Sequence, residues 1–264
     1  MTQSEHIRKL FDLTGKIAIV TGGAGQGYGH QCVEALGEAG ATVVLTSRDA
    51  DRAGAAAAGF KEAGLDVEGA RLELTDSDSI ESLVHETKDR HGRIDVLVNS
   101  AARNVLASVD SITLEQWDSV LAVNLTGTML MSRRVATVMR REGRPGSVIC
   151  ISSIYGVVAP DPSIYGTSGL NSPLAYGVTK AGLIQMTKYL AVEWAPQIRV
   201  NCITAGGLQA GQDAAFVEGY SRRTPLQRMA GPTDLKGAVV FLASGASRWV
   251  TGHNLIVDGG WTIW

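Results

Sequence analysis

A tyrosine and a lysine stand four residues apart in the segment Tyr176-Gly-Val-Thr-Lys180. Because this segment is predicted to lie near the start of a helix, the phenol and the ammonium share one helix face. A free phenol has a pKa of about 10, and a neighbouring cation lowers that pKa by favouring the phenolate. The pair therefore indicates acid–base chemistry by tyrosine, although a single match of this kind has low specificity.

Two further polar residues stand where they could assist such chemistry. Ser153 ends a predicted strand, at an edge where its hydroxyl could hydrogen-bond a substrate carbonyl. Asn124 interrupts an apolar helical stretch, and it is either a satisfied core amide or part of a proton path. The cysteines and histidines lack the spacing of a metal site, so no metal is expected.

A glycine-rich segment at 21–29 (TGGAGQGYG) follows the first predicted strand. Glycines allow backbone N–H groups to approach a pyrophosphate, and the next helix directs its positive end toward it. The second predicted strand ends in Thr46-Ser47-Arg48, with no carboxylate before Asp49. A guanidinium there suits a 2′-phosphate, so we expect NADP(H), with NAD(H) as the alternative. Arg48 could instead be only a solvated residue at a helix start.

These residues are separated by alternating strand-like and helix-like segments. Strands are predicted at 16–21, 42–47, 67–74, 94–98, 147–151, 198–203 and 254–257. Helices are predicted at 29–39, 49–63, 76–91, 113–141, 174–194 and 232–243. Strands that are apolar throughout and alternate with helices indicate a parallel sheet covered on both faces. We predict a three-layer, doubly wound α/β sheet of seven parallel strands, a Rossmann fold, in one domain spanning 1–264.

The composition excludes several classes of protein. The 264 residues are 45% hydrophobic and 19% charged, with a net charge of −2, so neither disorder nor binding of nucleic acid through bulk charge is expected. No run of about 18 apolar residues could span a membrane, and 1–13 does not resemble a signal peptide. Three cysteines standing singly in apolar segments are typical of reduced thiols in a cytoplasmic protein.

Seven segments, in order, resemble the short-chain dehydrogenase/reductase family from about residue 13 to 261. They are TGGAGQGYG at 21–29, VNSAA at 98–102, VNLTG at 123–127, ISS at 151–153, YGVTK at 176–180, RVNCITAGG at 199–207 and TGHNLIVDGG at 251–260. The resemblance implies hydride transfer between a nicotinamide and a carbonyl or secondary alcohol. It implies that Tyr176 is the general acid/base and that Lys180 lowers its pKa and binds the nicotinamide ribose. Ser153, chosen over Ser152, would polarise the carbonyl, and Asn124 would hold a water that links Lys180 to solvent.

The resemblance also implies a set of cofactor contacts. These are Gly22, Gly27, Tyr28, Ser47, Arg48, Glu73, Leu74, Asn99, Ala101, Tyr176, Lys180, Gly206 and Leu208. The chain departs from the family pattern at several of them. The glycine loop has one extra residue, Glu73 replaces an aspartate, and Ala205-Gly206 replaces Pro-Gly, so we expect a looser loop after the sixth strand.

Two loops are predicted to contact the substrate. The stretch 154–173 is longer than usual in the family and carries Asp161, Tyr165, Thr167, Ser168 and Asn171, which suits a hydroxylated, sugar-like substrate. It could equally be a surface or subunit-contact insertion. The stretch 206–230 resembles the family's substrate lid, and its candidate contacts are Gln209, Gln212, Phe216, Tyr220, Arg222 and Arg223.

The C-terminal Trp261 and Trp264 are predicted to leave aromatic area exposed in a monomer, and such area usually marks an interface. The family resemblance implies a dimer or tetramer, and we expect a homotetramer. The predicted function is NADP(H)-dependent oxidoreduction of a small polar, sugar-like molecule, without nucleic-acid or membrane partners. The alternatives are a 3-oxoacyl-thioester reductase, an NAD-dependent alcohol dehydrogenase and a non-catalytic dinucleotide-binding sensor.

Overall fold

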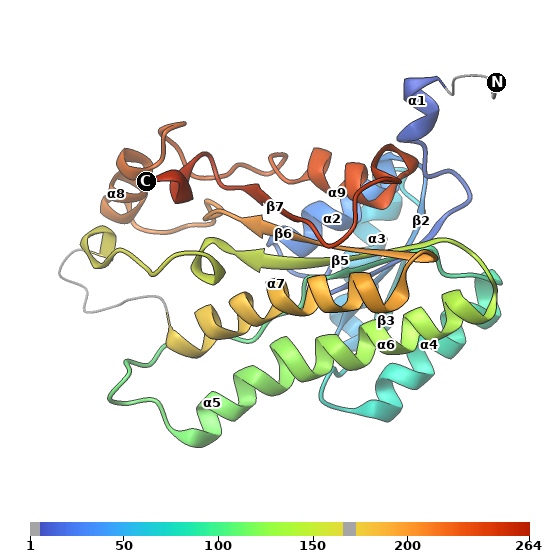
Figure 1. Ribbon diagram of the computed structural model, residues 1–264, viewed down its shortest axis with the longest axis horizontal. Coiled ribbons are helices and arrows are strands. Elements are labelled where there is room, and N and C mark those ends of the chain that lie inside the picture. Colours follow the sequence, from blue (N-terminus) through green and yellow to red (C-terminus); the bar gives the residue numbers. More distant parts are fainter. Residues whose placement is uncertain (1–5, 166–172) are drawn as a thin grey trace.

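The computed structural model describes residues 6–165 and 173–264, and it contains one sheet of seven parallel strands (Figure 1). The strand order is β3-β2-β1-β4-β5-β6-β7, which confirms the predicted doubly wound fold. The strands are β1 (Ile17–Thr21), β2 (Thr42–Ser47), β3 (Val67–Arg71), β4 (Val96–Asn99), β5 (Gly146–Ser153), β6 (Ile198–Ala205) and β7 (Asn254–Val257).

Helices cover both faces of the sheet, as Figure 1 shows. One face carries α2 (Tyr28–Glu38), α3 (Ala50–Glu62) and α9 (Lys236–Ala243), and the other carries α4 (Ser77–His91), α6 (Thr128–Arg141) and α7 (Leu174–Trp194). In β1, Ala18 and Val20 join the first core and Ile19 joins the second. Since successive strand side chains point to opposite faces, burial on both sides explains why these strands are apolar throughout.

Side-chain caps set where several helices begin. The carboxylate of Asp49 accepts hydrogen bonds from Asp51 and Arg52 at the start of α3, and Asp76 caps α4 in the same way. Thr113 and Gln116 form a reciprocal capping box at the start of α5 (Leu114–Leu121). These caps fix how each chain segment leaves the carboxyl edge of the sheet, where strand ends turn into helices.

The helix predicted at 113–141 is confirmed as unbroken helical chain from 114 to 141, but a π-helical segment, η1 (Ala122–Gly127), separates α5 from α6 within it. Asn124 lies in this segment, buried, and bonds to groups outside its own helix. A π-helical turn inserts one residue into the helical repeat and is frequent at functional sites. Gly127, at its end, lies so close to Leu74 that a Cβ would stand 2.6 Å from the Leu74 carbonyl oxygen.

Two short helical elements and one longer helix were not predicted as such. The N-terminal α1 (Ile7–Leu10) precedes the sheet. The stretch 206–230 contains a ten-residue helix, α8 (Ala214–Arg223), where only short helical pieces were expected. It lies against η3 (Pro162–Tyr165) of the preceding loop, in a third apolar cluster separate from the two cores of the sheet. The two predicted substrate loops are therefore packed together.

The sheet reverses its winding between β1 and β4, which are neighbours although β2 and β3 intervene in the chain. The chain leaves the carboxyl ends of these two strands toward opposite faces, and this opens a crevice where ligands bind in doubly wound folds. Every sequence-predicted site residue that follows a strand is thereby brought to this edge.

Candidate active site

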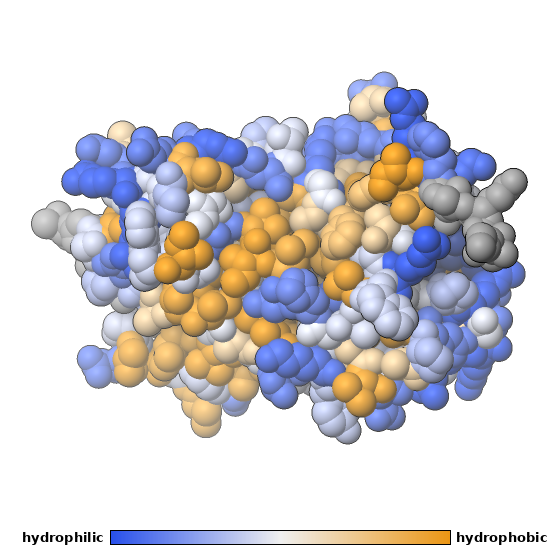
Figure 2. Space-filling model, turned by 45° about the horizontal axis from the view of Figure 1, so that its top comes forward, coloured by the Kyte–Doolittle hydropathy of each residue, from blue (hydrophilic) through white to orange (hydrophobic). Residues whose placement is uncertain are grey.

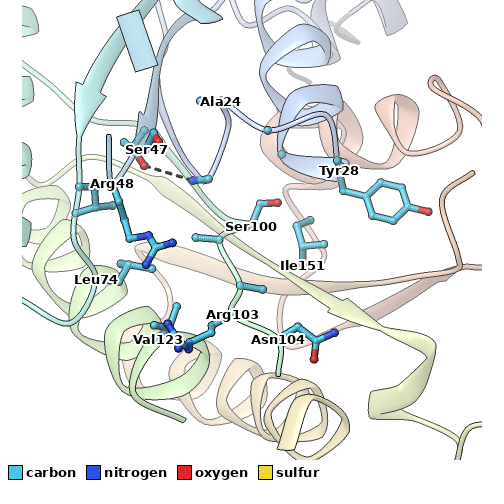
Figure 3. Close-up of a pocket in the computed structure, with 18 of the residues that line it drawn as sticks. Ala24, Tyr28, Ser47, Arg48, Leu74, Ser100, Arg103, Asn104, Val123 and Ile151 are labelled. Atoms are coloured by element: carbon cyan, nitrogen blue, oxygen red, sulfur yellow. Dashed lines mark hydrogen bonds between the residues drawn. The ribbon is translucent and has the colours of Figure 1, made fainter. Parts of the chain in front are cut away.

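A cavity of about 700 Å³ runs along the carboxyl edge of the sheet at this crevice (Figure 3). It extends from the glycine-rich loop and the end of β2 to the end of β5 and the start of α7. Most residues predicted to bind the cofactor or to act in catalysis line it. They are Gly22, Gly27, Tyr28, Ser47, Arg48, Glu73, Leu74, Ala101, Ser153, Tyr176, Lys180 and Gly206.

The glycine-rich loop needs glycine for two different reasons. Gly22 has φ +71°, and a Cβ there would stand 2.8 Å from the Cα of Ala101, so the neighbouring chain excludes any side chain. At Gly27 a Cβ would meet nothing within 4 Å, since this residue borders the cavity itself. Within the described chain, no group accepts from the backbone N–H of Tyr28 or Gly29 at the start of α2. These donors are oriented for an anion.

Two hydroxyl groups hold the walls of the cavity in place. The buried Thr21 accepts hydrogen bonds from the backbone N–H groups of Ser100 and Ala101, both at 3.1 Å, and so joins the end of β1 to the loop after β4. The phenol of Tyr28 donates to the carbonyl of Gly206 at 2.9 Å. Burial raises the pKa of Tyr28, which keeps it a hydrogen-bond donor.

Cations dominate the end of the cavity beside β2. The guanidiniums of Arg48, Arg52 and Arg103 line it, and in the described part of the chain no hydrogen bond or ion pair engages them. Glu73 is the one carboxylate among the lining residues. Partial burial disfavours its charge, but hydrogen bonds from Thr75 and the nearby Arg48 outweigh this and lower the pKa of Glu73. This end is thus built for an anionic ligand.

The opposite end brings the predicted catalytic residues together. Lys180 is 3% exposed, its Nζ donates to the Ile151 carbonyl at 2.7 Å, and Nζ lies 5.3 Å from the centre of the Tyr176 ring. The ammonium and the phenol thus share one face of α7, as their spacing predicts. The buried ammonium is close enough to the phenol to interact with charge that develops there during a proton transfer.

The two serines at the end of β5 have different partners. Ser152 donates to the Lys180 carbonyl at 2.8 Å and serves to attach β5 to α7. Within the described residues, Ser153 accepts a bond from the Tyr155 N–H, at 3.3 Å, and donates none, so its own O–H proton is left for a ligand. This difference supports the choice of Ser153 over Ser152.

Asn124 lies next to the cavity without lining it. Its Oδ1 accepts from the Arg103 N–H at 2.7 Å, and its Nδ2 donates to the Arg103 carbonyl and to Thr179 Oγ1, both at 3.0 Å. Thr179 in turn donates to the Tyr176 carbonyl at 2.8 Å. The amide therefore ties the loop after β4 to the turn of α7 that carries the tyrosine. The predicted water beside Asn124 stays a prediction.

Two predicted cofactor residues lie away from the cavity surface. The buried Asn99 donates through Nδ2 to Ser132 at 2.8 Å, inside the second core. Leu208 pairs with Ala230 in an isolated bridge that closes the 206–230 stretch on itself. Their predicted contacts with a dinucleotide remain predictions.

The predicted substrate-lid residues are mostly engaged in the protein. Tyr220 is buried, accepts from the Gly207 N–H at 2.6 Å and stacks on Trp261 with ring centres 4.3 Å apart. Arg222 pairs with Glu218, and Arg223 forms an ion pair with Asp161 at 3.4 Å across the two loops. Of the polar residues predicted in the longer loop, Thr167, Ser168 and Asn171 lie outside the described residues.

The expectation for the C-terminal tryptophans was half wrong. Trp261 is 1% exposed because Tyr220 and Arg223 cover it, the latter 5.0 Å from its ring centre. Trp264 is exposed, as predicted, and Trp249 is 97% exposed without having been singled out in the sequence.

Sequence reasoning also missed several residues that line the cavity. Arg52 follows Arg48 at helical spacing, which is a signal that could have been used. Arg103 and Asn104 follow the VNSAA motif on an irregular loop, where periodicity gives no guidance. Thr46 accepts from the Gly22 N–H at 3.4 Å and was quoted only as part of a strand end.

Within the described ranges, no helix is long and apolar enough to cross a membrane. No cluster of three or more His, Cys, Asp or Glu side chains that could hold a metal ion occurs there either.

Comparisons with known proteins agree with this site. Residues 23–262 match a family model described as enoyl-(acyl carrier protein) reductase. An NADP-dependent mannitol dehydrogenase from Alternaria alternata is 32% identical, with 99% of this chain and 97% of the relative covered. An NAD-dependent glycerol dehydrogenase from Listeria innocua is 33% identical, with 97% of both chains covered.

Among solved structures, a gluconate 5-dehydrogenase from Burkholderia cenocepacia, in complex with NADP and tartrate, superposes with a TM-score of 0.89. It is 30% identical, and the match covers 98% of this chain and 100% of the other. Together with the seven ordered motifs and the cavity that they form, these matches lead to one conclusion. The chain belongs to the short-chain dehydrogenase/reductase family of NAD(P)-dependent oxidoreductases.

Proposed function

We propose that this protein is an NADP(H)-dependent oxidoreductase that interconverts a secondary alcohol and a carbonyl on a small polyhydroxylated substrate. The observation that carries the proposal is that one cavity joins the glycine loop and its arginines to Ser153, Tyr176 and Lys180. The relatives named for mannitol, glycerol and gluconate act on polyols or sugar acids, which supports a sugar-like substrate.

Several features of the cavity suit a dinucleotide. The free N–H groups at the start of α2 and the open space at Gly27 suit a pyrophosphate. Arg48 and Arg52 suit an additional phosphate on the adenosine ribose, because no hydrogen bond or ion pair in the described chain engages their guanidiniums and Glu73 is the one carboxylate that lines the cavity with them. This supports NADP(H) over NAD(H), although the relatives include proteins named for each.

The nicotinamide, when bound, supplies or accepts the hydride, and the protein supplies orientation and proton transfer. In reduction, the Ser153 hydroxyl donates a hydrogen bond to the substrate carbonyl oxygen and polarises it. Tyr176 then donates its proton to the oxygen that becomes the alcohol. The Lys180 ammonium stabilises the phenolate that remains, and oxidation reverses these steps. The family resemblance also assigns to Asn124 a water that links Lys180 to solvent, and this relay is part of the proposal.

The described part of the longer loop, 154–165, and the stretch 206–230 form the substrate side of the proposed site. Tyr155 and Tyr165 share a hydrogen bond at 2.8 Å between their hydroxyls, and the Tyr165 and Phe216 rings contact each other at 5.3 Å. Asn104 also lines the cavity and can hydrogen-bond a substrate hydroxyl. Tyrosine hydroxyls held by packed aromatic rings, together with an asparagine amide, suit a hydroxylated molecule better than the acyl chain of a 3-oxoacyl thioester.

We further propose a cytoplasmic homotetramer. Three buried free thiols agree with a reducing compartment. Figure 2 shows apolar side chains gathered over α9 and the edge strand β7, and Ile256 of β7 is exposed. An apolar surface of this kind usually becomes covered by another subunit. Light scattering at low micromolar concentration tests the assembly, and a monomeric mass would contradict it.

The enzymatic proposal is tested by following NADPH and NADH absorbance against a panel of ketoses, keto-acids of sugars, diketones and the corresponding polyols. We expect turnover with NADPH and a keto-sugar, and Tyr176→Phe should lower kcat by about 10²- to 10⁴-fold with unchanged cofactor affinity. Cofactor binding without turnover across the panel would instead indicate a sensor.

A further inference from the structure

Arg103 stands on the wall of the cavity opposite to β2 and α3, in the loop after β4. Both the N–H and the carbonyl of the Arg103 backbone are hydrogen-bonded to the side-chain amide of Asn124. Asn124 Oδ1 accepts from the N–H at 2.7 Å, and Nδ2 donates to the carbonyl at 3.0 Å. The side chain of Arg103 is exposed, and in the described chain no hydrogen bond or ion pair engages the guanidinium. The backbone of Arg103 is thus held in place, while its guanidinium has no partner in the described chain and can bind a ligand.

The direction of this side chain relates it to the cationic end of the cavity. Figure 3 shows Arg103 turned toward Val123 and the side of the cavity that carries Arg48 and Leu74, whereas Asn104, the next residue, turns the other way. The two neighbours therefore serve opposite ends of the cavity. Asn104 faces the proposed substrate side, and Arg103 faces the nucleotide side.

The charges of the cavity are unbalanced without a ligand. Arg48, Arg52, Arg103 and Lys180 line it, and among the lining residues only Glu73 opposes them. The Oε1 atom of Glu73 already accepts two hydrogen bonds from Thr75. Like charges grouped around one cavity are unfavourable in the free protein, so a ligand with several negative charges would relieve them. A dinucleotide carries such charges on its pyrophosphate and on a 2′-phosphate.

We propose that Arg103 is a phosphate-binding residue that grips the adenosine half of the dinucleotide from the wall opposite to Arg48 and Arg52. The inference rests on the proposed use of NAD(P)(H) and adds a contact from a loop whose motif assigns no cation. A planar guanidinium can form two parallel hydrogen bonds with a phosphate, which a lysine cannot reproduce. Clamping from two sides would hold the dinucleotide across the crevice.

The test is calorimetric titration of NADPH, NADH and adenosine 2′,5′-bisphosphate into wild type, Arg103→Gln, Arg103→Lys and Arg141→Gln. The Arg141 control removes the same charge at the end of α6, beside the amino end of β5 and thus at the opposite edge of the sheet. Backbone bonds of residue 103 do not depend on its side chain, so the variants should keep the wild-type melting temperature.

We expect Arg103→Gln to weaken NADPH binding about tenfold at low salt, with Arg103→Lys in between and Arg141→Gln unchanged. The salt dependence of the wild-type Kd should be steeper than that of Arg103→Gln. If Arg103→Gln weakens the binding of NADPH and NADH equally, the contact is with the pyrophosphate. If it weakens the binding of NADPH and the bisphosphate but not of NADH, the contact is with the 2′-phosphate. Either result supports the proposal. Wild-type affinity of Arg103→Gln for both cofactors would overturn it. If the wild-type protein binds neither cofactor, the proposed function itself fails.

Discussion

Alanine substitutions at three glycines distinguish the effect of an added methyl group on ligand binding from its effect on the stability of the fold. Gly27 begins α2 with φ −98° and ψ −157°, an extended conformation that alanine adopts freely, and a Cβ there meets nothing within 4 Å. Gly27→Ala should therefore change the free energy of unfolding by about 0.5 kcal/mol or less. The added methyl would nevertheless lie in the cavity, beside the free N–H groups of Tyr28 and Gly29.

The expected loss of affinity follows from these donors. A hydrogen bond between an N–H and a phosphate is worth about 1.5–3 kcal/mol, and displacing the pyrophosphate from one of them should raise the Kd for NADPH about 10- to 100-fold. Fluorescence titration measures the Kd, and chemical denaturation measures the stability of the same samples. Unchanged affinity in Gly27→Ala would refute the placement of the pyrophosphate at this helix start.

Two other glycines serve as matched controls. At Gly29 a Cβ would lie 2.5 Å from the Gly22 carbonyl oxygen, so Gly29→Ala should lower both stability, by about 1–3 kcal/mol, and affinity. At Gly59, on the exposed face of α3, a Cβ meets nothing, so Gly59→Ala should stabilise the fold by about 0.5–1 kcal/mol without changing the Kd. If all three variants lost affinity equally, the methyl group would be acting through general distortion.

Three other predictions concern single side chains. Asn124→Ala leaves Arg103 without two bonds and Thr179 without one, so the free energy of unfolding in urea should fall by about 2–4 kcal/mol; a fall below about 1 kcal/mol would contradict this. Arg48→Ala should reduce the preference in kcat/KM for NADPH over NADH about tenfold, and an unchanged ratio would show that Arg48 is only a solvated residue. Burial raises the pKa of Tyr220 to about 12, so its stabilising contribution is complete below about pH 10 and is lost as the pH rises toward 12. The difference in unfolding free energy between wild type and Tyr220→Phe should shrink by up to about 2 kcal/mol over that range, and a constant difference would refute the assignment.

The parts of the fold that could be predicted from the sequence follow from burial on both sheet faces. The strand run at 42–47 and the helix at 174–194 have the predicted bounds, because both lie between clear turn signals. The order of the strands in the sheet was not needed to find the site. Since all parallel strands end at one edge, residues that follow a strand, such as Arg48 and Ser153, had to meet there.

The parts that could not be predicted depend on contacts between distant segments. Nothing in the apolar periodicity of 113–141 shows the π-helical turn, which accompanies the bonds of Asn124 to Arg103 and Thr179. Trp261 is buried because α8 supplies Tyr220 and Arg223 above it, and that helix was not predicted. Local pattern thus brought the proposed catalytic residues together but could not show which loops would pack beside them.

The hydrogen bond from the Tyr28 hydroxyl to the Gly206 carbonyl joins the start of α2 to the start of the stretch 206–230, two segments that are far apart in the sequence. Tyr28 starts the helix at the proposed nucleotide site, and Gly206 starts the stretch at 206–230 that we propose as the substrate lid. Whatever stiffens one segment must then favour one arrangement of the other, and thermodynamic linkage makes that influence reciprocal. The two ligands should consequently bind cooperatively, with the dinucleotide preparing the enclosure for its reaction partner. Replacing this tyrosine by phenylalanine should bring the ratio of substrate affinities with and without dinucleotide closer to one, and an unaltered ratio would show that the cooperativity travels by another route.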